Sequence, residues 1–250
     1  MTPTFSIADD GVATLCLNRP RHLNRLHRED LLALLGHFER LAADPAPRAL
    51  VLTGSGRVFC AGFNLDELEG ASDPRLFERT VDALEALPLP TIARLNGSVY
   101  GGATDLALAC DWRIGVAGME LRMPAARLGL HYYPNGLRRY VSRLGLGAAK
   151  RLFLLAESVG ADELLRIGYL DTLVADAAAL DAEVARLAAL LAANAPLAVR
   201  GMKASLDEIA RGEFDPALLR TREAECAASA DLREGVAAFA ERRAPRFAGR

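Results

Sequence analysis

The sequence is poor in the features that mark several common classes of protein. Its 250 residues carry a formal net charge of only −2, so electrostatics give no reason to expect nucleic acid as a partner. No apolar run is long enough to span a bilayer, and residues 1–10 lack a basic region followed by an apolar one. These absences favour a soluble cytoplasmic protein without a membrane partner.

Cysteine is scarce and scattered. The cysteines are Cys16, Cys60, Cys110 and Cys226. They form no C-x-x-C pair, so a zinc site and a disulfide framework are both unexpected, and small buried thiols are predicted instead. A nucleophilic thiol would need a basic partner. Three of the four histidines, His22, His27 and His37, cluster near the first predicted helix, and nothing in the sequence pairs one of them with Cys60.

Apolar residues are abundant, at 51%, which is ample for a buried core. In the first half of the chain, short apolar runs alternate with segments that have helical periodicity. The runs predict strands at residues 11–17, 49–53, 91–95 and 112–116. Helices are predicted at residues 27–42, 73–87 and 102–110. This alternation favours an α/β fold with parallel strands.

The second half of the chain has a different character, because it is rich in alanine and leucine. Helices are predicted at residues 146–155, 161–167, 180–193, 196–209 and 215–228, and only residues 172–174 resemble a strand. We therefore expect a boundary near residues 160–170, with a core over 1–165 and a helical region over 166–250. Such a small helical region should pack on the core or on a neighbouring subunit.

Two turns made of small residues are the first candidates for chemistry. They lie in V-F-C-A-G-F-N-L-D-E (58–67) and V-Y-G-G-A-T-D-L-A-L-A-C-D (99–111), and each leads from a strand into a helix. A helix start leaves N–H groups free and carries partial positive charge. If both turns point to one place, they form a pair of donors for an oxyanion. The alternative is that the glycines only permit tight packing.

Several motifs stand in order along nearly the whole chain. They are L-N-R-P-R-H-L-N-R-L (17–26), G-S-G-R-V-F-C-A-G-F-N-L (54–65), P-T-I-A-R-L-N-G-S-V-Y-G-G-A-T-D-L-A-L-A-C-D (90–111), P-A-A-R-L-G-L (124–130), S-R-L-G-L-G-A-A-K-R-L-F-L (142–154), A-D-E-L-L-R-I-G-Y-L-D-T-L-V (161–174) and E-R-R-A-P-R-F-A-G-R (241–250). Together they resemble the enoyl-CoA hydratase/isomerase family of the crotonase superfamily. The resemblance implies a crotonase-like spiral of ββα turns with a C-terminal helical region, assembled as a homotrimer or homohexamer.

The resemblance also implies an acyl-CoA thioester as substrate. Coenzyme A is then part of the substrate, so no separate cofactor and no metal are expected. The thioester oxygen would lie between the backbone N–H groups of Phe63 and Gly102. The CoA moiety would lie over the early segment and the first small-residue turn, and the residues implied there are Arg21, Leu23, Arg25, Ala61, Leu65 and Asp66.

Asp105 stands three residues after Gly102, where similar hydratases carry a glutamate. A carboxyl group in apolar surroundings is suited to proton transfer, so Asp105 is the expected catalytic acid. Ala125 stands where similar hydratases carry a second glutamate. Some decarboxylases of the family place a tyrosine in the following loop, and Tyr132 resembles it. The alternative is that Tyr132 and its neighbour Tyr133 only form the wall of the acyl pocket.

The sequence therefore predicts an enzyme that stabilises a thioester enolate and moves a proton with Asp105. Hydration of an enoyl-CoA and isomerisation of its double bond are the expected reactions. Decarboxylation and thioester hydrolysis remain alternatives within the same fold. A further alternative is a relative that binds CoA or RNA and has lost catalysis, which the missing second acid favours and the retained Asp105 opposes.

Overall fold

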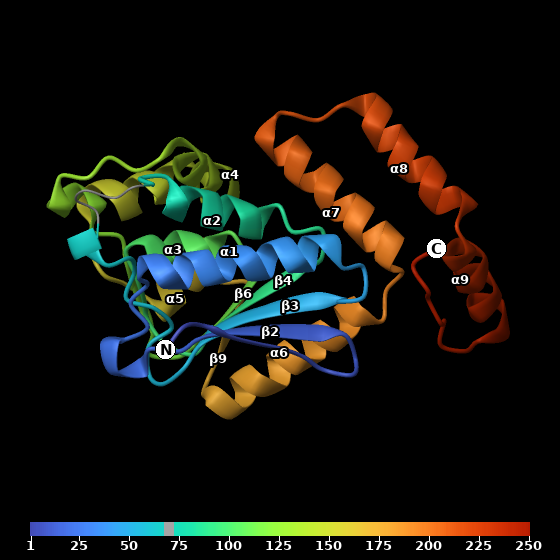
Figure 1. The fold of residues 1–250 in the computed structure, drawn as a ribbon, viewed down its shortest axis with the longest axis horizontal. Coiled ribbons are helices and arrows are strands. Elements are labelled where there is room, and N and C mark those ends of the chain that lie inside the picture. Colours follow the sequence, from blue (N-terminus) through green and yellow to red (C-terminus); the bar gives the residue numbers. More distant parts are fainter. Residues whose placement is uncertain (68–72) are drawn as a thin grey trace.

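A six-stranded sheet forms the centre of the fold (Figure 1). The computed structural model describes residues 1–67 and 73–250. Within them the sheet has the order β1-β2-β3-β4-β6-β9, and all neighbours are parallel except β1 and β2. The strands are β1 (Thr4–Ile7), β2 (Val12–Leu17), β3 (Ala49–Gly54), β4 (Thr91–Leu95), β6 (Trp112–Val116) and β9 (Thr172–Val174). The α/β fold with parallel strands is confirmed.

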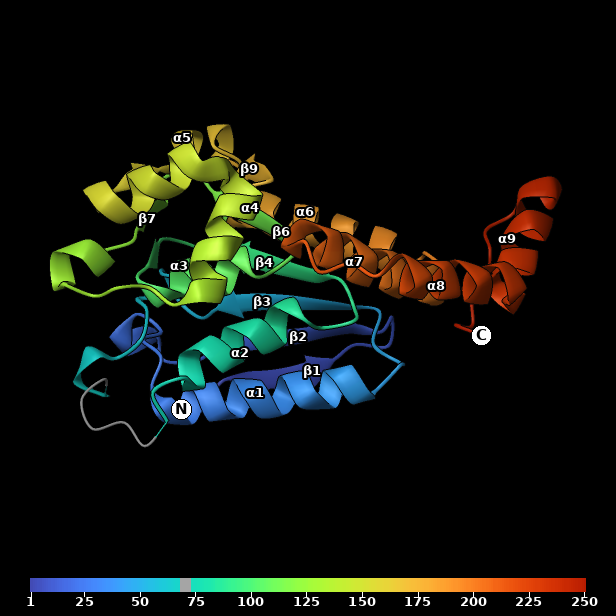
Figure 2. The same cartoon turned by 90° about the horizontal axis from the view of Figure 1, so that it is seen from above.

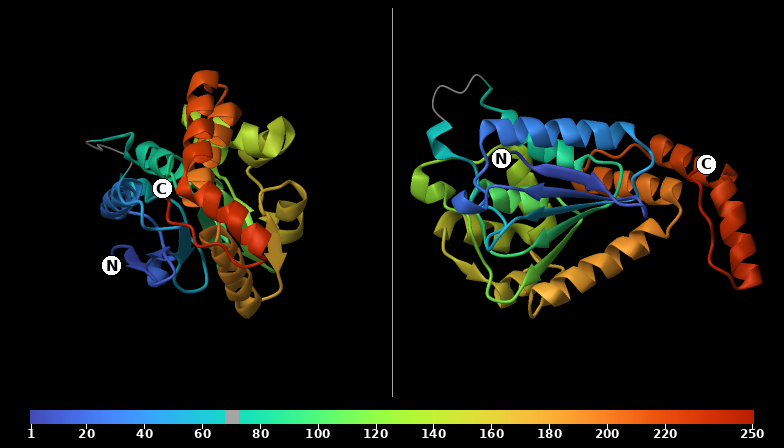
Figure 3. Two further views of the ribbon diagram at one scale, coloured as in Figure 1. Left: turned by 90° about the vertical axis from the view of Figure 1, so that its right-hand side faces the viewer. Right: turned by 60° about the horizontal axis from the view of Figure 1, so that its bottom comes forward.

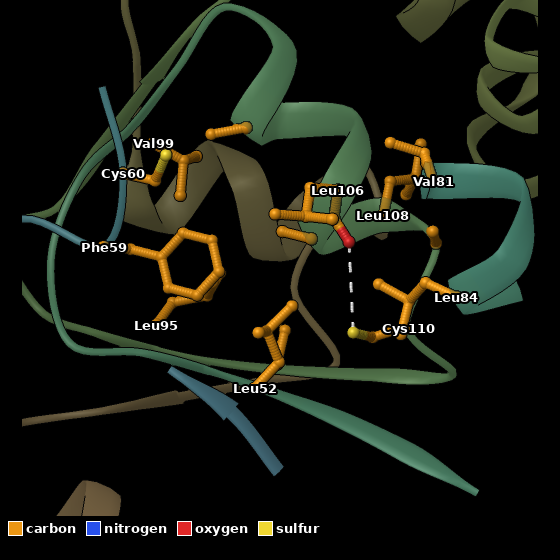
Figure 4. Packing of buried hydrophobic residues seen from close by; sticks show 14 of the residues in the cluster. Leu52, Phe59, Cys60, Val81, Leu84, Leu95, Val99, Leu106, Leu108 and Cys110 are labelled. Carbon is orange, nitrogen blue, oxygen red and sulfur yellow. Dashed lines mark hydrogen bonds between the residues drawn. The ribbon is translucent and has the colours of Figure 1, made fainter. Parts of the chain in front are cut away.

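The central strands are covered on both faces. Every residue of β3 is buried except Thr53, which is half-buried, and this unbroken apolar pattern is typical of a parallel strand between two layers. Leu52 faces the larger core cluster, where it packs with Phe59 and Leu106 (Figure 4). Val51 belongs to a second cluster on the opposite face.

Helices form the two covering layers. One face of the sheet carries α1 (Arg28–Ala43), α2 (Leu76–Glu85) and α3 (Gly102–Leu108), and the other carries α6 (Ala177–Ala192) (Figures 1 and 3). Leu180 and Val184 of α6 pack on the second cluster. The sheet is therefore the middle layer of three, and α3 lies with the helices of the larger cluster.

A small second sheet brings the second glycine turn into position. It has the order β5-β7-β8, with β5 at Val99–Tyr100, β7 at Glu120–Arg122 and β8 at Val159–Gly160. β5 leads through Gly101 directly into α3. The remaining helices of this part are α4 (Pro134–Lys150), a π-helical turn (Arg151–Leu155), α5 (Ala161–Arg166) and three 3-10 turns (Pro20–His22, Leu65–Glu67 and Ala125–Leu128).

Three C-terminal helices extend away from the sheet. They are α7 (Pro196–Arg211), α8 (Pro216–Ala228) and α9 (Ala230–Glu241), with α9 at the far end (Figure 2). β9 and α6, although they follow residue 165, belong to the sheet and to its cover. The expected boundary at 165 therefore falls before the last strand of the core, and the projecting arm begins only with α7.

Some elements differ from the sequence-based prediction. The helix expected at 146–155 is divided between the end of α4 and the π-helical turn at Arg151–Leu155. Helix α4 begins at Pro134 and is interrupted by non-helical backbone at Gly145, where φ is +79°. The helix expected from residue 73 begins at Leu76. The sequence also gave no indication of β1 or α9. Strand β1 is short and mostly exposed, so it lacks the apolar pattern that identifies a strand.

The length and composition of the helices indicate whether any of them could span a membrane. In the described residues no single helix is long and apolar enough to cross a membrane. The pair α6 and α7 passes such a test only when taken together, and the two helices are bent by 105° at their break.

Asn24 ties the early segment to the loop after β3. Its backbone has φ of +54°, and its side chain is buried. The amide nitrogen donates to three carbonyl oxygens, those of Ser55 (2.8 Å), Val58 (2.9 Å) and Phe59 (3.1 Å). Because residues 55–59 lead directly into the first small-residue turn, this amide positions that turn.

We expect Asn24→Ala to lower the free energy of unfolding by about 2–3 kcal/mol, since buried carbonyl groups lose their donor. Urea unfolding followed by circular dichroism measures the change. Asn194→Ala, which replaces an exposed asparagine, is the matched control and should change stability by less than about 0.5 kcal/mol. Equal stability of the two variants would contradict the role given to Asn24.

Candidate active site

A cleft of about 1030 Å³ is lined by both predicted turns. Its walls come from the start of α1, the loop around residue 63, the start of α2 and residues 123–133. The lining residues include Phe63, Phe77, Gly102, Tyr132 and Tyr133. A cavity of this size is large enough for a small-molecule substrate.

The two small-residue turns touch one another. Tyr100 donates its N–H to the carbonyl oxygen of Cys60 at 3.0 Å, which joins the segments side by side. A Cβ atom added to Gly62 would lie 2.8 Å from the Tyr100 oxygen and 3.4 Å from the Gly102 nitrogen. This close approach, with φ of +92° at Gly62, requires glycine. The glycines thus permit the tight packing of the two turns, and the same packing brings the N–H groups of both turns to one place.

The N–H groups of Phe63 and Gly102 are available to a ligand. Within residues 1–67 and 73–250, neither donates a hydrogen bond to a protein acceptor. Gly102 is the first residue of α3, where an N–H has no acceptor within the helix. Both residues line the cleft. The arrangement can therefore bind an anionic oxygen.

Aromatic rings enclose the region next to these donors. The ring of Phe77 packs on Gly102 so closely that a Cβ there would lie 2.6 Å from the ring. The ring centroid of Phe77 lies 6.1 Å from that of Phe63 and 6.1 Å from that of Tyr133. Tyr132 stacks on Tyr133 at 4.5 Å. An acyl group bound beside Gly102 would meet an apolar wall.

Asp105 is completely buried and lies behind the two tyrosines. Its side chain is 0% exposed and does not line the cleft, whereas Tyr132 and Tyr133 do. One carboxylate oxygen accepts a hydrogen bond from Tyr133, and the Tyr132 hydroxyl lies 3.3 Å from the same oxygen. The other oxygen accepts from Arg139 at 2.8 Å. Asp105 is therefore shielded from solvent, as its apolar segment predicts, but its carboxylate also has polar partners that the segment did not indicate.

Arg139 is the residue that the sequence analysis missed at this site. Its guanidinium is 0% exposed and also binds Asp82 at 2.9 Å and Glu85 at 2.9 Å. Burial alone would raise the pKa of Glu85, but Arg139, Arg143 and Arg138 lower that pKa to about 2. Asp105 thus lies at the end of a buried network in which each charge is compensated. No local motif indicates this, because Arg139 and Asp105 are separated by 34 residues.

The residues predicted for the CoA moiety divide into two groups. Ala61, Leu65 and Asp66 line the cleft. Arg21, Leu23 and Arg25 are not among its lining residues, although Ala61 donates its N–H to the Leu23 oxygen at 2.9 Å. The early segment therefore borders the cleft.

Additional residues at the mouth of the cleft were not predicted. His27, Arg28 and Glu67 line it. Glu67 accepts a hydrogen bond from the Arg28 N–H at 2.7 Å and contacts His27 at 2.5 Å. These contacts fix the 3-10 turn at Leu65–Glu67 against the start of α1.

Ala125 lines the cleft and contributes no carboxylate. Among the described residues, the acidic side chains that line the cleft all come from residues 29–78. The wall formed by residues 123–133 has instead the polar side chains of His131, Tyr132 and Tyr133. On this wall, a proton can be exchanged only through one of these groups.

The comparisons with known proteins agree with this geometry. The family model described as enoyl-CoA hydratase/isomerase matches residues 8–250. The chain belongs to the enoyl-CoA hydratase/isomerase family, within the crotonase superfamily. It is 33% identical over 248 residues to a crotonyl-CoA hydratase of Syntrophomonas wolfei, covering 96% of this chain and 95% of the relative. A short-chain-enoyl-CoA hydratase of Clostridium acetobutylicum is 31% identical, covering 93% and 92%.

Solved structures show the same family fold. An enoyl-CoA hydratase from Bacillus anthracis superposes with a TM-score of 0.91 at 28% identity, covering 100% of both chains. The predicted crotonase-like fold is thereby confirmed. The protein is an enzyme of the enoyl-CoA hydratase/isomerase type, which processes acyl-CoA.

Two of the four thiols of this enzyme are unsuited to nucleophilic catalysis. Cys60 and Cys110 are fully buried, and burial raises the pKa of each thiol to about 12. The Cys60 thiol donates a hydrogen bond to the backbone carbonyl oxygen of Asn24 at 3.0 Å. Cys16 and Cys226 are half-buried, so the prediction of buried thiols is confirmed for only two of the cysteines.

Alkylation should distinguish these two classes of thiol, because the reagent needs both access and a thiolate. We expect iodoacetamide at neutral pH to leave Cys60 and Cys110 unmodified in the folded enzyme. After unfolding in urea, all four cysteines should react, as measured by peptide mass spectrometry. Rapid modification of Cys60 in the folded enzyme would contradict the burial of its thiol.

Proposed function

We propose that this enzyme polarises the thioester carbonyl of an acyl-CoA between the N–H groups of Phe63 and Gly102. The observation that carries the proposal is the contact between the two turns, with both donors open to the cleft. Two such N–H groups, with the start of α3 adding partial positive charge, stabilise an enolate more than they stabilise the neutral thioester. That difference lowers the barrier to removing a proton from the α-carbon.

Asp105 is the acid proposed to move the proton. Water addition requires activation of a water molecule as well as proton delivery to the α-carbon. Ala125 contributes no carboxylate, and the acidic side chains that line the cleft come from residues 29–78, so Asp105 is the one carboxylate proposed for both tasks. A shift of the double bond needs only one group, which removes a proton at one carbon and returns it at another. Isomerisation of an enoyl-CoA is therefore the favoured reaction.

Hydration of a short enoyl-CoA is the second candidate. It is favoured by the relatives named crotonyl-CoA hydratase and short-chain-enoyl-CoA hydratase. Decarboxylation and thioester hydrolysis use the same enolate or oxyanion site and are outcomes of the same experiment. For the CoA moiety, Arg21, Leu23 and Arg25 would contact the phosphates and their surroundings, while Ala61, Leu65 and Asp66 would line the adenine pocket.

A panel of acyl-CoA esters, with products identified by mass spectrometry, tests the reaction. We expect 3-enoyl-CoA to be isomerised and crotonyl-CoA to be hydrated only weakly, since the second acid is missing. One acid–base group typically contributes about 10²–10⁴-fold, so Asp105→Asn should lose at least that much activity. Hydration of crotonyl-CoA with kcat near ~10³ s⁻¹ would contradict the preference.

Binding of an unreactive acyl-CoA, measured by titration calorimetry, is the control for this panel. Asp105→Asn should bind it as the unchanged enzyme does, because the carboxylate does not line the cleft. Absence of any binding by the unchanged enzyme would contradict the proposal as a whole. Binding without turnover of any ester would indicate the catalytically weak relative, and salt-sensitive RNA binding would identify the RNA-binding alternative.

We also propose that the projecting helices mediate assembly into a trimer or hexamer. Large apolar side chains on α7 and α9 are exposed, including Leu206 (66%), Val236 (64%) and Phe239 (88%). Exposed apolar surface on a projecting arm is costly in water and is typical of a subunit interface.

Light scattering at micromolar concentration should therefore give three or six times the 26.8 kDa chain mass. Phe239→Glu should weaken the assembly by placing charge in the interface. Arg166→Glu on α5 is the control and should leave the mass unchanged, because this side chain is 70% exposed and lies outside the projecting helices. A stable monomer would refute the proposed assembly.

A further inference from the structure

The position of Asp105 raises a question about how the proton reaches the substrate. Asp105 is 0% exposed, and the cleft wall in front of it is formed by Tyr132 and Tyr133. A substrate in the cleft can contact the tyrosine hydroxyl region without contacting the carboxylate. Proton exchange between Asp105 and the substrate then requires a group between them.

We propose that the Tyr133 hydroxyl is this group, and that Asp105 accepts or returns its proton from behind. The inference rests on the proposed function, since it names the atom that contacts the substrate in that reaction. Tyr133 becomes the catalytic residue at the acyl position, and Asp105 acts through it.

The packing distinguishes Tyr133 from Tyr132. The Tyr132 ring packs toward the core, against Phe153 at 5.1 Å and over Gly136, where a Cβ would lie 2.4 Å from the ring. The Tyr133 ring packs edge-on against Phe77, and Phe77 lies directly on Gly102. The ring of Phe77 therefore packs against both Tyr133 and Gly102, and this places Tyr133 close to the donor N–H. Its hydroxyl also makes the closer contact with Asp105, since that of Tyr132 is 3.3 Å away.

Arg139 keeps Asp105 in place as the acceptor. The guanidinium binds Asp105 at 2.8 Å, Asp82 at 2.9 Å and Glu85 at 2.9 Å, and it is 0% exposed. Because α2 supplies two of these carboxylates, the cation cannot turn away from α3 without leaving buried charge unpaired. The Asp105 oxygen that does not bind Arg139 is the one that faces Tyr133.

The proposed step balances without a further reactant. A C–H bond at the α-carbon breaks, and its proton bonds to the Tyr133 oxygen while the Tyr133 proton moves to Asp105. The electron pair of the C–H bond passes to the thioester oxygen as the enolate, held by Phe63 and Gly102. The reverse transfer at the γ-carbon completes the shift of the double bond. Burial, followed by the charge of Asp105, raises the pKa of Tyr133, so the hydroxyl keeps a proton to pass on.

The test compares Tyr133→Phe, Asp105→Asn and the double variant. The measurements are isomerisation of a 3-enoyl-CoA and deuterium uptake at its α-carbon in D₂O. Each single variant should lose about 10²–10⁴-fold in kcat with KM within about threefold. Because the two groups act as one unit, the double variant should lose no more than the slower single variant. Losses that multiply, or full activity in Tyr133→Phe, would overturn the inference.

Two further variants make the comparison specific. Asn194 is exposed and is not among the residues that line the cleft, so Asn194→Ala is the control and should keep normal rates. Tyr132→Phe should lose less than Tyr133→Phe, and the reverse order would overturn the inference. An unchanged enzyme that binds acyl-CoA but exchanges no α-proton would overturn the proposed function itself, and this inference with it.

Discussion

The buried guanidinium of Arg139 is the constraint on which the candidate site depends. Each of its terminal nitrogens and its Nε binds a carboxylate, from Asp82, Glu85 and Asp105. A buried cation without such partners would be destabilising by several kcal/mol, so the three helices that carry these groups must keep their relative positions. α3 presents Gly102 at its start and Asp105 one turn later. Fixing α3 against α2 and α4 therefore positions the donor N–H and the acid together.

The same constraint explains which part of the site could be predicted from the sequence. The donors at Phe63 and Gly102 are properties of the local backbone, and the glycines that permit the close approach are visible as residues. Asp105 is visible as an acid at a fixed spacing from Gly102. Its partner Arg139 lies 34 residues further along the chain. No periodicity or spacing in the sequence predicts the ion pair between Arg139 and Asp105. From the sequence, Asp105 is therefore an acid in an apolar segment without a visible partner.

Some strands of the fold can be predicted from their own residues, whereas others depend on partners that are distant in the sequence. The buried strands β3, β4 and β6 were predicted because parallel strands covered on both faces carry nearly unbroken apolar runs. The two-residue strands β5 and β8 have no such pattern, since they are defined by their neighbours in space. Similarly, β9 looked like an isolated strand in a helical region. Only its pairing with β6 shows that the core continues past residue 165.

Ala125, Tyr132 and Tyr133 together determine the chemistry of one wall of the cleft. Ala125 contributes no carboxylate to that wall, and the two tyrosines cover the buried carboxylate of Asp105 behind it. An exposed pair of acids can activate water, whereas a phenol in front of a buried anion excludes water from that anion. The proposed oxyanion site does not depend on these side chains, because its donors are backbone N–H groups. In the proposed mechanism, the scaffold can therefore keep its means of stabilising an enolate when the group that handles the proton differs.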